Sequence, residues 1–259
     1  MIIIGGAEDK ENEKSILATF HELAGGTQAR ILIVPTASSM PEILGEVYRQ
    51  LFVKMGAAKA EVLRVANRYE ADLPENAEMV KTYTGLFMTG GDQLRLCQVI
   101  AGTLMADAMQ ASSQAGELVI AGTSAGASAI GDCMIARGYS GESPRRSIVD
   151  LTIGLGILQN VIIDQHFHNR NRLARLMTAV SLRPECLGVG IDENTAVILQ
   201  QDSTLEVIGE GSVAIVDGSE LVYNTINETQ ASQPFSVGSF RIHIMAKGQR
   251  FSLRDRKIL

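Results

Sequence analysis

A candidate nucleophile is Ser124, at the centre of the sequence Gly-Thr-Ser-Ala-Gly that spans residues 122–126. This segment follows the apolar run Leu118–Ala121 and leads into small residues that suit a helix. A sharp strand-to-helix turn exposes the hydroxyl of its serine, and glycines supply the backbone angles that such a turn needs. The first amide groups of the helix would then face a developing oxyanion. The sequence therefore predicts a nucleophilic serine, with a tight structural turn as the alternative.

A second polar stretch, residues 164–172, follows the apolar run Val161–Ile163, so its side chains are expected at the end of a strand. A serine nucleophile needs a base with a pKa near neutrality, which histidine provides. His166 and His168 are the candidates, and their spacing does not decide between them. A metal site made of Asp164 with both histidines is the alternative, but no further ligand cluster supports it. We predict neither a metal nor another cofactor.

Three arginines, Arg170, Arg172 and Arg175, lie at the start of a predicted helix over Asn169–Leu182. Such a group often forms a solvated face. In an acidic protein, beside a candidate base, it can instead form a wall that binds carboxylates, because guanidinium groups pair with carboxylates through two hydrogen bonds. This interpretation predicts a substrate with free carboxylates.

The segment Met88–Gln93 also ends an apolar run and contains two adjacent glycines. The N–H group of Gly91 or of its neighbour, together with that of Ala125, could form the pair of donors that stabilises the oxyanion in acyl transfer. Gln93 could then contact amide or carboxylate groups of a substrate. A β-turn capped by Asp92 is an equally simple interpretation.

A carboxylate is needed to orient the catalytic histidine and to stabilise its charged form. Glu193, after another short apolar run, is the preferred candidate. Glu142, in the polar loop Arg137–Arg146, is the alternative, and that loop could equally act as a mobile lid or specificity loop.

The composition fits one globular domain over residues 1–259, with 46% hydrophobic and 20% charged residues. A net charge of −6 argues against a nucleic-acid-binding surface. We expect a cytoplasmic protein without a membrane partner, because no signal peptide or spanning segment is evident. The three widely spaced cysteines predict reduced, partly buried thiols.

Short β-branched runs alternate with segments of helical period, which predicts an α/β fold with a mainly parallel sheet and helices on both faces. Ligands of such folds bind beyond the carboxyl ends of the strands. The predicted strands are Ile2–Ile4, Ile31–Val34, Val62–Val65, Leu86–Met88, Leu118–Ala121 and Val161–Ile163. Helices are predicted over Glu13–Gly25 and Pro41–Gly56. Turn residues between later runs predict an antiparallel C-terminal extension with strands over Ala196–Gln200, Leu205–Ile208, Val213–Val216 and Ile242–Met245.

The motifs IIGGAEDK, TGGDQ, GTSAGA and DQHF, followed by the arginine series, together resemble the cyanophycinase family. The resemblance implies a serine peptidase related to aspartyl dipeptidases, with a fold like that of class I glutamine amidotransferases, acting as a homodimer. The implied substrate is cyanophycin, a polyaspartate that carries arginine on each side-chain carboxyl and is cleaved to β-Asp-Arg dipeptides.

The resemblance also implies roles for individual residues. Ser124 would be the nucleophile, His166 the base and Glu193 the third member, while Glu142 stands where some alignments place the acid. The residues implied to line the pocket are Gln93, Asp164, Gln165, Arg170, Arg172 and Arg175.

Three other functions remain open from the sequence. An aspartyl dipeptidase or another isopeptidase would use the same chemistry on a different substrate. An esterase of the α/β-hydrolase type is disfavoured if the acid is Glu193, since the acid then follows the histidine. A non-catalytic nucleotide-binding module could use Gly5-Gly6 and Gly90-Gly91, although the usual phosphate-binding spacings are missing.

Overall fold

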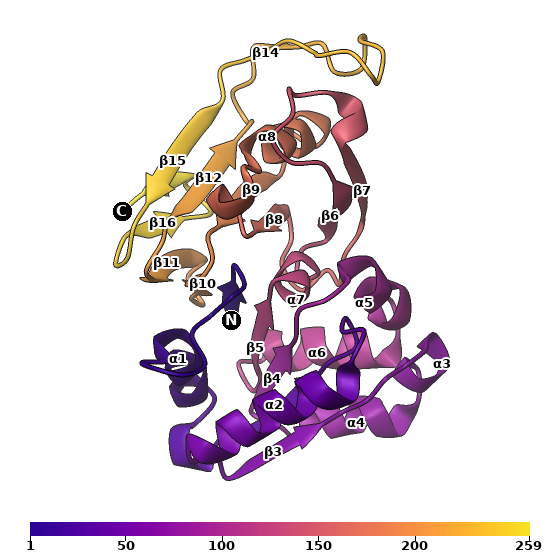
Figure 1. Cartoon of the computed structure of the whole chain (residues 1–259), viewed down its shortest axis with the longest axis vertical. Coiled ribbons are helices and arrows are strands. Elements are labelled where there is room, and N and C mark those ends of the chain that lie inside the picture. The colour runs from indigo at the N-terminus through magenta and orange to yellow at the C-terminus, as the bar shows by residue number, and fades with distance from the viewer.

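The largest sheet of the computed structural model, which describes residues 1–259, has nine strands (Figure 1). One half is parallel and contains, in spatial order, β1 (Ile2–Ile4), β5 (Val119–Thr123), β4 (Gly85–Met88), β2 (Arg30–Val34) and β3 (Lys59–Val62). The other half is antiparallel and contains β10 (Thr195–Leu199), β11 (Thr204–Gly209), β16 (Arg250–Ser252) and β17 (Lys257–Ile258). The predicted α/β class with a late antiparallel extension is confirmed.

Helices cover both faces of the parallel half, because alternate side chains of each strand point to opposite sides. Ile31 and Ile33 pack in one apolar cluster with Phe20 and Phe52, whereas Leu32 packs in the cluster on the other side. The first face carries α1 (Ser15–Leu23) and α2 (Pro41–Lys54). The second face carries α3 (Arg68–Ala71), α4 (Pro74–Lys81), α5 (Gln93–Ile100), α6 (Leu104–Gln114) and α7 (Ala125–Ser128).

A second sheet of four strands lies beside the first in the upper part of Figure 1. Its strands, in spatial order, are β15 (Arg241–Met245), β12 (Val213–Asp217), β9 (Leu187–Ile191) and β8 (Val161–Gln165). Val161 and Ile163 join the same apolar cluster as Leu32, so the two sheets share one core. Ile162 points the other way, into a smaller cluster with α8 (Leu173–Leu182) and with the hairpin of β6 (Cys133–Gly138) and β7 (Val149–Ile153).

The remaining elements are short. They are β13 (Tyr223–Asn224), β14 (Val237–Gly238) and the 3₁₀ turns Gly26–Gln28, Arg146–Ile148 and His168–Arg170. All three cysteines are free, as predicted, and they are buried rather than partly buried. None of the helices combines the length and the apolar character that crossing a bilayer requires.

One predicted strand is misplaced. The run Val62–Val65 overlaps β3 only at Val62, because β3 is an edge strand of four residues that ends at Val62. Leu63 and Val65 are buried although they belong to the following loop. Their apolar character therefore reflects a loop that packs on the core rather than a strand.

Candidate active site

Ser124 occupies the turn between β5 and α7, with φ 53° and ψ −114°. A positive φ is uncommon for a residue with a side chain, and strained backbone of this kind clusters at functional sites. The flanking glycines allow the turn: a Cβ on Gly122 would lie 2.4 Å from the carbonyl oxygen of Gly126. Ser124 is partly exposed between buried neighbours. The local sequence thus presents a single hydroxyl at the carboxyl end of the parallel strands.

His166 meets this hydroxyl from the second sheet. It follows directly after β8, and its Nε2 atom lies 3.0 Å from Ser124 Oγ. Its Nδ1 atom lies 2.5 Å from Oε1 of Glu193, which follows β9 after a short turn. Burial lowers the pKa of His166, and the hydrogen bond to Glu193 opposes this shift. The hydroxyl, the imidazole and the carboxylate therefore form a continuous hydrogen-bonded triad, and the imidazole is mainly neutral at neutral pH.

A turn at Phe167 separates the two candidate histidines. Phe167 is fully buried, and a Cβ on Gly190 would lie 2.5 Å from its ring, so only glycine leaves room for this packing. Beyond the turn, His168 is exposed and its Nδ1 atom lies 3.0 Å from Oδ1 of Asp192. His166 is therefore the histidine that reaches Ser124.

Gly6 holds the face of the His166 ring. Its φ is 97°, and a Cβ there would lie 2.5 Å from the imidazole. The adjacent carbonyl of Gly5 accepts a hydrogen bond of 2.8 Å from the His166 N–H. Asn194, with φ 47°, donates its N–H to the Gly6 carbonyl. The paired glycines, which could have belonged to a nucleotide-binding module, pack around the imidazole instead.

The structure differs from the predicted carboxylate-binding wall of three arginines, because two of them pair with a carboxylate of the protein itself. Arg175 donates from Nε to Oδ2 of Asp164 over 2.7 Å, and a second donor reaches Oδ1 over 2.5 Å. Asp164 is 1% exposed. Arg172 donates hydrogen bonds to the same carboxylate and to the Gln165 carbonyl. Burial lowers the pKa of Arg172 to about 10. A buried carboxylate must be paired, so these contacts of Asp164 with Arg172 and Arg175 fix β8 to α8. Only Arg170 is exposed.

Gln93 and Gln165 are the remaining predicted pocket residues. The Gln93 amide nitrogen donates to the carbonyls of Ile135 and Ala136, each at 3.1 Å, so only its oxygen is left for a ligand. The side-chain oxygen of Gln165 lies 3.3 Å from Ser124 Oγ.

Gly90 and Gly91 lie beside the nucleophile after β4. A Cβ on Gly90 would be 3.3 Å from the Ser124 Cβ, and Gly91 has φ 143° and is exposed. The N–H of Gly91 donates no hydrogen bond within the chain. Asp92 caps α5 by accepting from the N–H groups of Leu94 and Arg95. The turn is therefore capped by Asp92 and also leaves a backbone donor next to Ser124.

Glu142 makes no hydrogen bond with the His166 ring, whose partners are Ser124 and Glu193. It is exposed and pairs with Arg145, three residues further along its loop. The alternative acid is therefore not the partner of the imidazole. No group of three His, Cys, Asp or Glu side chains is close enough together to hold a metal ion.

Two residues that support the site were not singled out from the sequence. The Asn169 side chain accepts a hydrogen bond of 3.0 Å from the Glu193 N–H. Glu8 is buried and accepts a hydrogen bond of 2.6 Å from the hydroxyl of Thr123, the residue before the nucleophile. Gly5-Gly6 directly after the strand β1 was the local signal that this segment approaches another element closely.

A strained serine at the carboxyl end of a parallel strand, aligned with an imidazole and a carboxylate, defines a hydrolase of the serine type. Residues 1–207 match the model of peptidase family S51. The chain belongs to this family of serine peptidases.

The chain is similar to curated proteins along its whole length. It is 47% identical over 252 residues to the cyanophycinase of Geminocystis herdmanii, covering 97% of this chain and 93% of that protein. It is 45% identical over 259 residues to the cyanophycinase of Trichormus variabilis, covering 100% of this chain and 87% of that protein.

Two solved structures share the fold. A peptidase from an acI-B1 Actinobacterium aligns with a TM-score of 0.68 at 24% identity, covering 97% of this chain and 96% of that one. A putative peptidase E protein from Listeria monocytogenes aligns with a TM-score of 0.52 at 20% identity, covering 78% and 94% of the two chains. At these identities the likeness concerns the fold alone.

Proposed function

We propose that this serine peptidase hydrolyses the aspartyl backbone of cyanophycin and releases β-Asp-Arg dipeptides. The observation that carries the proposal is the unbroken chain from Ser124 through His166 to Glu193, with hydrogen-bond distances of 3.0 and 2.5 Å. Relatives named cyanophycinase, at 43–47% identity over nearly the whole chain, support this choice of substrate.

The proposed reaction begins when Nε2 of His166 takes the proton of the Ser124 hydroxyl. Ser124 Oγ then bonds to a backbone carbonyl carbon of the polymer, and the carbonyl oxygen gains the negative charge. The N–H groups of Gly91 and Ala125 stabilise this oxyanion. Glu193 stabilises the protonated imidazole, which next donates its proton to the departing amine as the C–N bond breaks. Water, deprotonated by His166, finally hydrolyses the ester on Ser124.

We propose that Arg170 and Gln93 contact the substrate directly. Arg170 is exposed beside His166 and binds a carboxylate of an arginyl branch. The free oxygen of Gln93 accepts from an N–H group, because its nitrogen is already used within the chain. Gln165 orients the substrate beside Ser124. The buried ion pair of Arg175 with Asp164 supports the site indirectly, because it fixes β8, the strand that His166 follows.

The test is digestion of purified cyanophycin with identification of the products by mass spectrometry, using Ser124→Ala as the control. We expect β-Asp-Arg from the unaltered protein and none above background from the variant. Intact polymer together with cleavage of Asp-X dipeptides would contradict the proposal and favour an aspartyl dipeptidase.

We also propose that two copies of the chain pair as a homodimer. Ile242 and Ile244 are 41% and 57% exposed on β15, the edge strand of the second sheet. An exposed apolar edge strand is suited to pairing with another chain. Light scattering on the purified protein should give twice the chain mass, and Ile244→Lys should shift it to the mass of one chain.

A further inference from the structure

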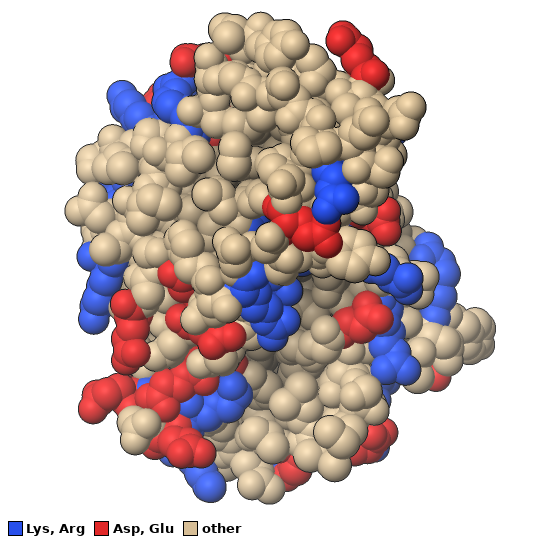
Figure 2. All heavy atoms as spheres, turned by 45° about the horizontal axis from the view of Figure 1, so that its top comes forward, with Lys and Arg blue, Asp and Glu red and all other residues tan.

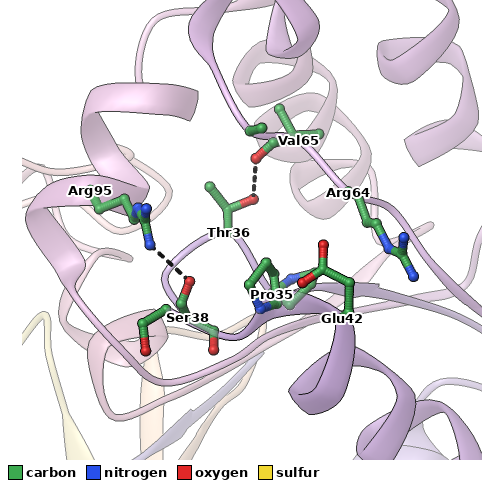
Figure 3. A pocket seen from close by; sticks show the side chains of 10 residues that line it. Pro35, Thr36, Ser38, Glu42, Arg64, Val65 and Arg95 are labelled. Atoms are coloured by element: carbon green, nitrogen blue, oxygen red, sulfur yellow. Dashed lines mark hydrogen bonds between the residues drawn. The ribbon is translucent and has the colours of Figure 1, made fainter.

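A cavity of about 140 Å³, lined mostly by polar and charged residues, lies at the carboxyl ends of β2 and β3 (Figure 3). Its walls come from the loop after β2, with Pro35, Thr36 and Ser38, and from the loop after β3, which contributes Arg64. The first turn of α2 and the first turn of α5 complete it. No residue of the Ser124, His166 and Glu193 chain lines this cavity, so it is a separate feature of the same sheet edge.

Two hydrogen bonds fix the walls of the cavity. The Thr36 hydroxyl donates to the Val65 carbonyl over 3.0 Å, which ties the loops after β2 and β3 together. Arg95 donates to the Ser38 carbonyl over 2.9 Å, which joins α5 to the loop after β2. Both bonds are drawn in Figure 3. The cavity is therefore built by the fold rather than left between loose side chains.

Charges of both signs border the cavity. In Figure 3, Arg95 lies on one side, and Arg64 with Glu42 lies on the other. All three side chains belong to exposed residues, and none has an oppositely charged atom within 4.0 Å. Nearby Glu46, by contrast, is paired with Arg49. Figure 2 likewise shows positive and negative side chains interspersed over one face of the molecule. A ligand that carries both a carboxylate and a cation matches such a site.

The cavity is within reach of the nucleophile. β2 and β3 lie two and three strands from β5, which corresponds to roughly 10 to 15 Å at the usual strand spacing. The loops between them are in contact: Asp92 donates its N–H to the Ala37 carbonyl over 2.8 Å, and Gly90 lies against Ser124. An extended chain covers roughly 3.3 to 3.6 Å per residue. A few residues of polymer thus span the distance.

We infer that this cavity is a second binding site for the polymer, which takes an arginyl branch of a unit that is not being cleaved. Arg64 and Arg95 bind the branch carboxylate, because guanidinium groups pair with carboxylates. Glu42 binds the branch guanidinium. The inference rests on the proposed substrate, since each arginyl branch of cyanophycin carries one carboxylate and one guanidinium group.

The test measures binding rather than turnover, by calorimetry in a Ser124→Ala background. The probes are a soluble oligomer of several β-Asp-Arg units and the single β-Asp-Arg dipeptide. We expect Arg64→Ala and Glu42→Gln each to weaken oligomer binding by about three- to tenfold. Dipeptide affinity should change less, because one unit does not reach both sites. Arg254→Ala, at an exposed arginine far along the chain after β16, is the matched control.

A second probe identifies the contact. In an oligomer whose arginine carboxylates are converted to carboxamides, Arg64→Ala should no longer weaken binding, whereas Glu42→Gln still should. Equal oligomer affinities of all variants, or no oligomer binding at all, would overturn the inference. The proposed function fails separately, when the unaltered protein leaves cyanophycin intact, and the binding measurement still decides whether the cavity holds the branch.

Discussion

The two sheets contribute to the site in different ways. The first sheet positions Ser124 by a strained local turn, in which Ser124 has a positive φ. The glycines that leave room for this turn lie two residues before and two residues after Ser124. The second sheet delivers His166 through long-range contacts with Gly6, Glu193 and the core that both sheets share. The nucleophile is thus a local product of sequence, whereas its base depends on how the sheets pack.

The largest effect should follow from removing the hydroxyl of Ser124, the residue positioned by local sequence. Ser124→Ala is expected to lower kcat on the order of 10⁶-fold, since the members of a hydrogen-bonded catalytic triad act as a unit. Turnover of cyanophycin by the purified variant measures this, with thermal unfolding as the check that the fold persists. A variant with ordinary turnover would show that another group attacks the substrate.

Breaking the partner of the imidazole should cost less. Glu193→Gln removes the charge that stabilises protonated His166, so kcat should fall by about 10²–10⁴-fold. Glu142→Gln is the matched control, because Glu142 pairs with Arg145 on an exposed loop. Comparable losses in both variants would mean that the 2.5 Å contact of His166 with Glu193 is not the one that matters.

A methyl group between the sheets should misalign the base. Gly6→Ala places a Cβ 2.5 Å from the imidazole, and a displacement of about 1 Å can cost about 10²-fold in rate. Gly56→Ala is a control with similar backbone strain, since Gly56 has φ 93° and open space around it. That variant should lose about 1–2 kcal/mol of stability and keep its kcat. If kcat falls equally in both, strain rather than contact with the ring is responsible.

The smallest expected effect is a shift along the pH axis. Catalysis requires neutral His166, so kcat/KM should be full above the pKa of this histidine and fall as the pH drops through it. Burial lowers that pKa from 6.5, which places the midpoint of the acid limb below 6.5. Glu193→Gln removes an interaction that raises the pKa of His166. The acid limb of kcat/KM in this variant should therefore move to still lower pH. A midpoint above 6.5 in the unaltered protein would contradict the buried environment of the base.

The sequence allowed the nucleophile side to be predicted more fully than the base side. The turn around Ser124, the capped turn at Asp92 and the early parallel strands follow from local patterns of glycine and apolar residues. The second sheet could not be anticipated, because the run Val161–Ile163 has the same apolar character whichever sheet it joins. The partner of Arg175 was also hidden, since Asp164 meets it only when α8 folds back on β8.

The central claim is that Ser124, activated across the two sheets by His166, forms the covalent intermediate. The direct measurement is labelling with a fluorophosphonate, followed by peptide mapping of the adduct in the unaltered protein and in a folded His166→Ala variant. We predict one adduct, on Ser124, that forms far more slowly when the imidazole is removed. An adduct on a different residue, or labelling of Ser124 at an unchanged rate in His166→Ala, would contradict the account.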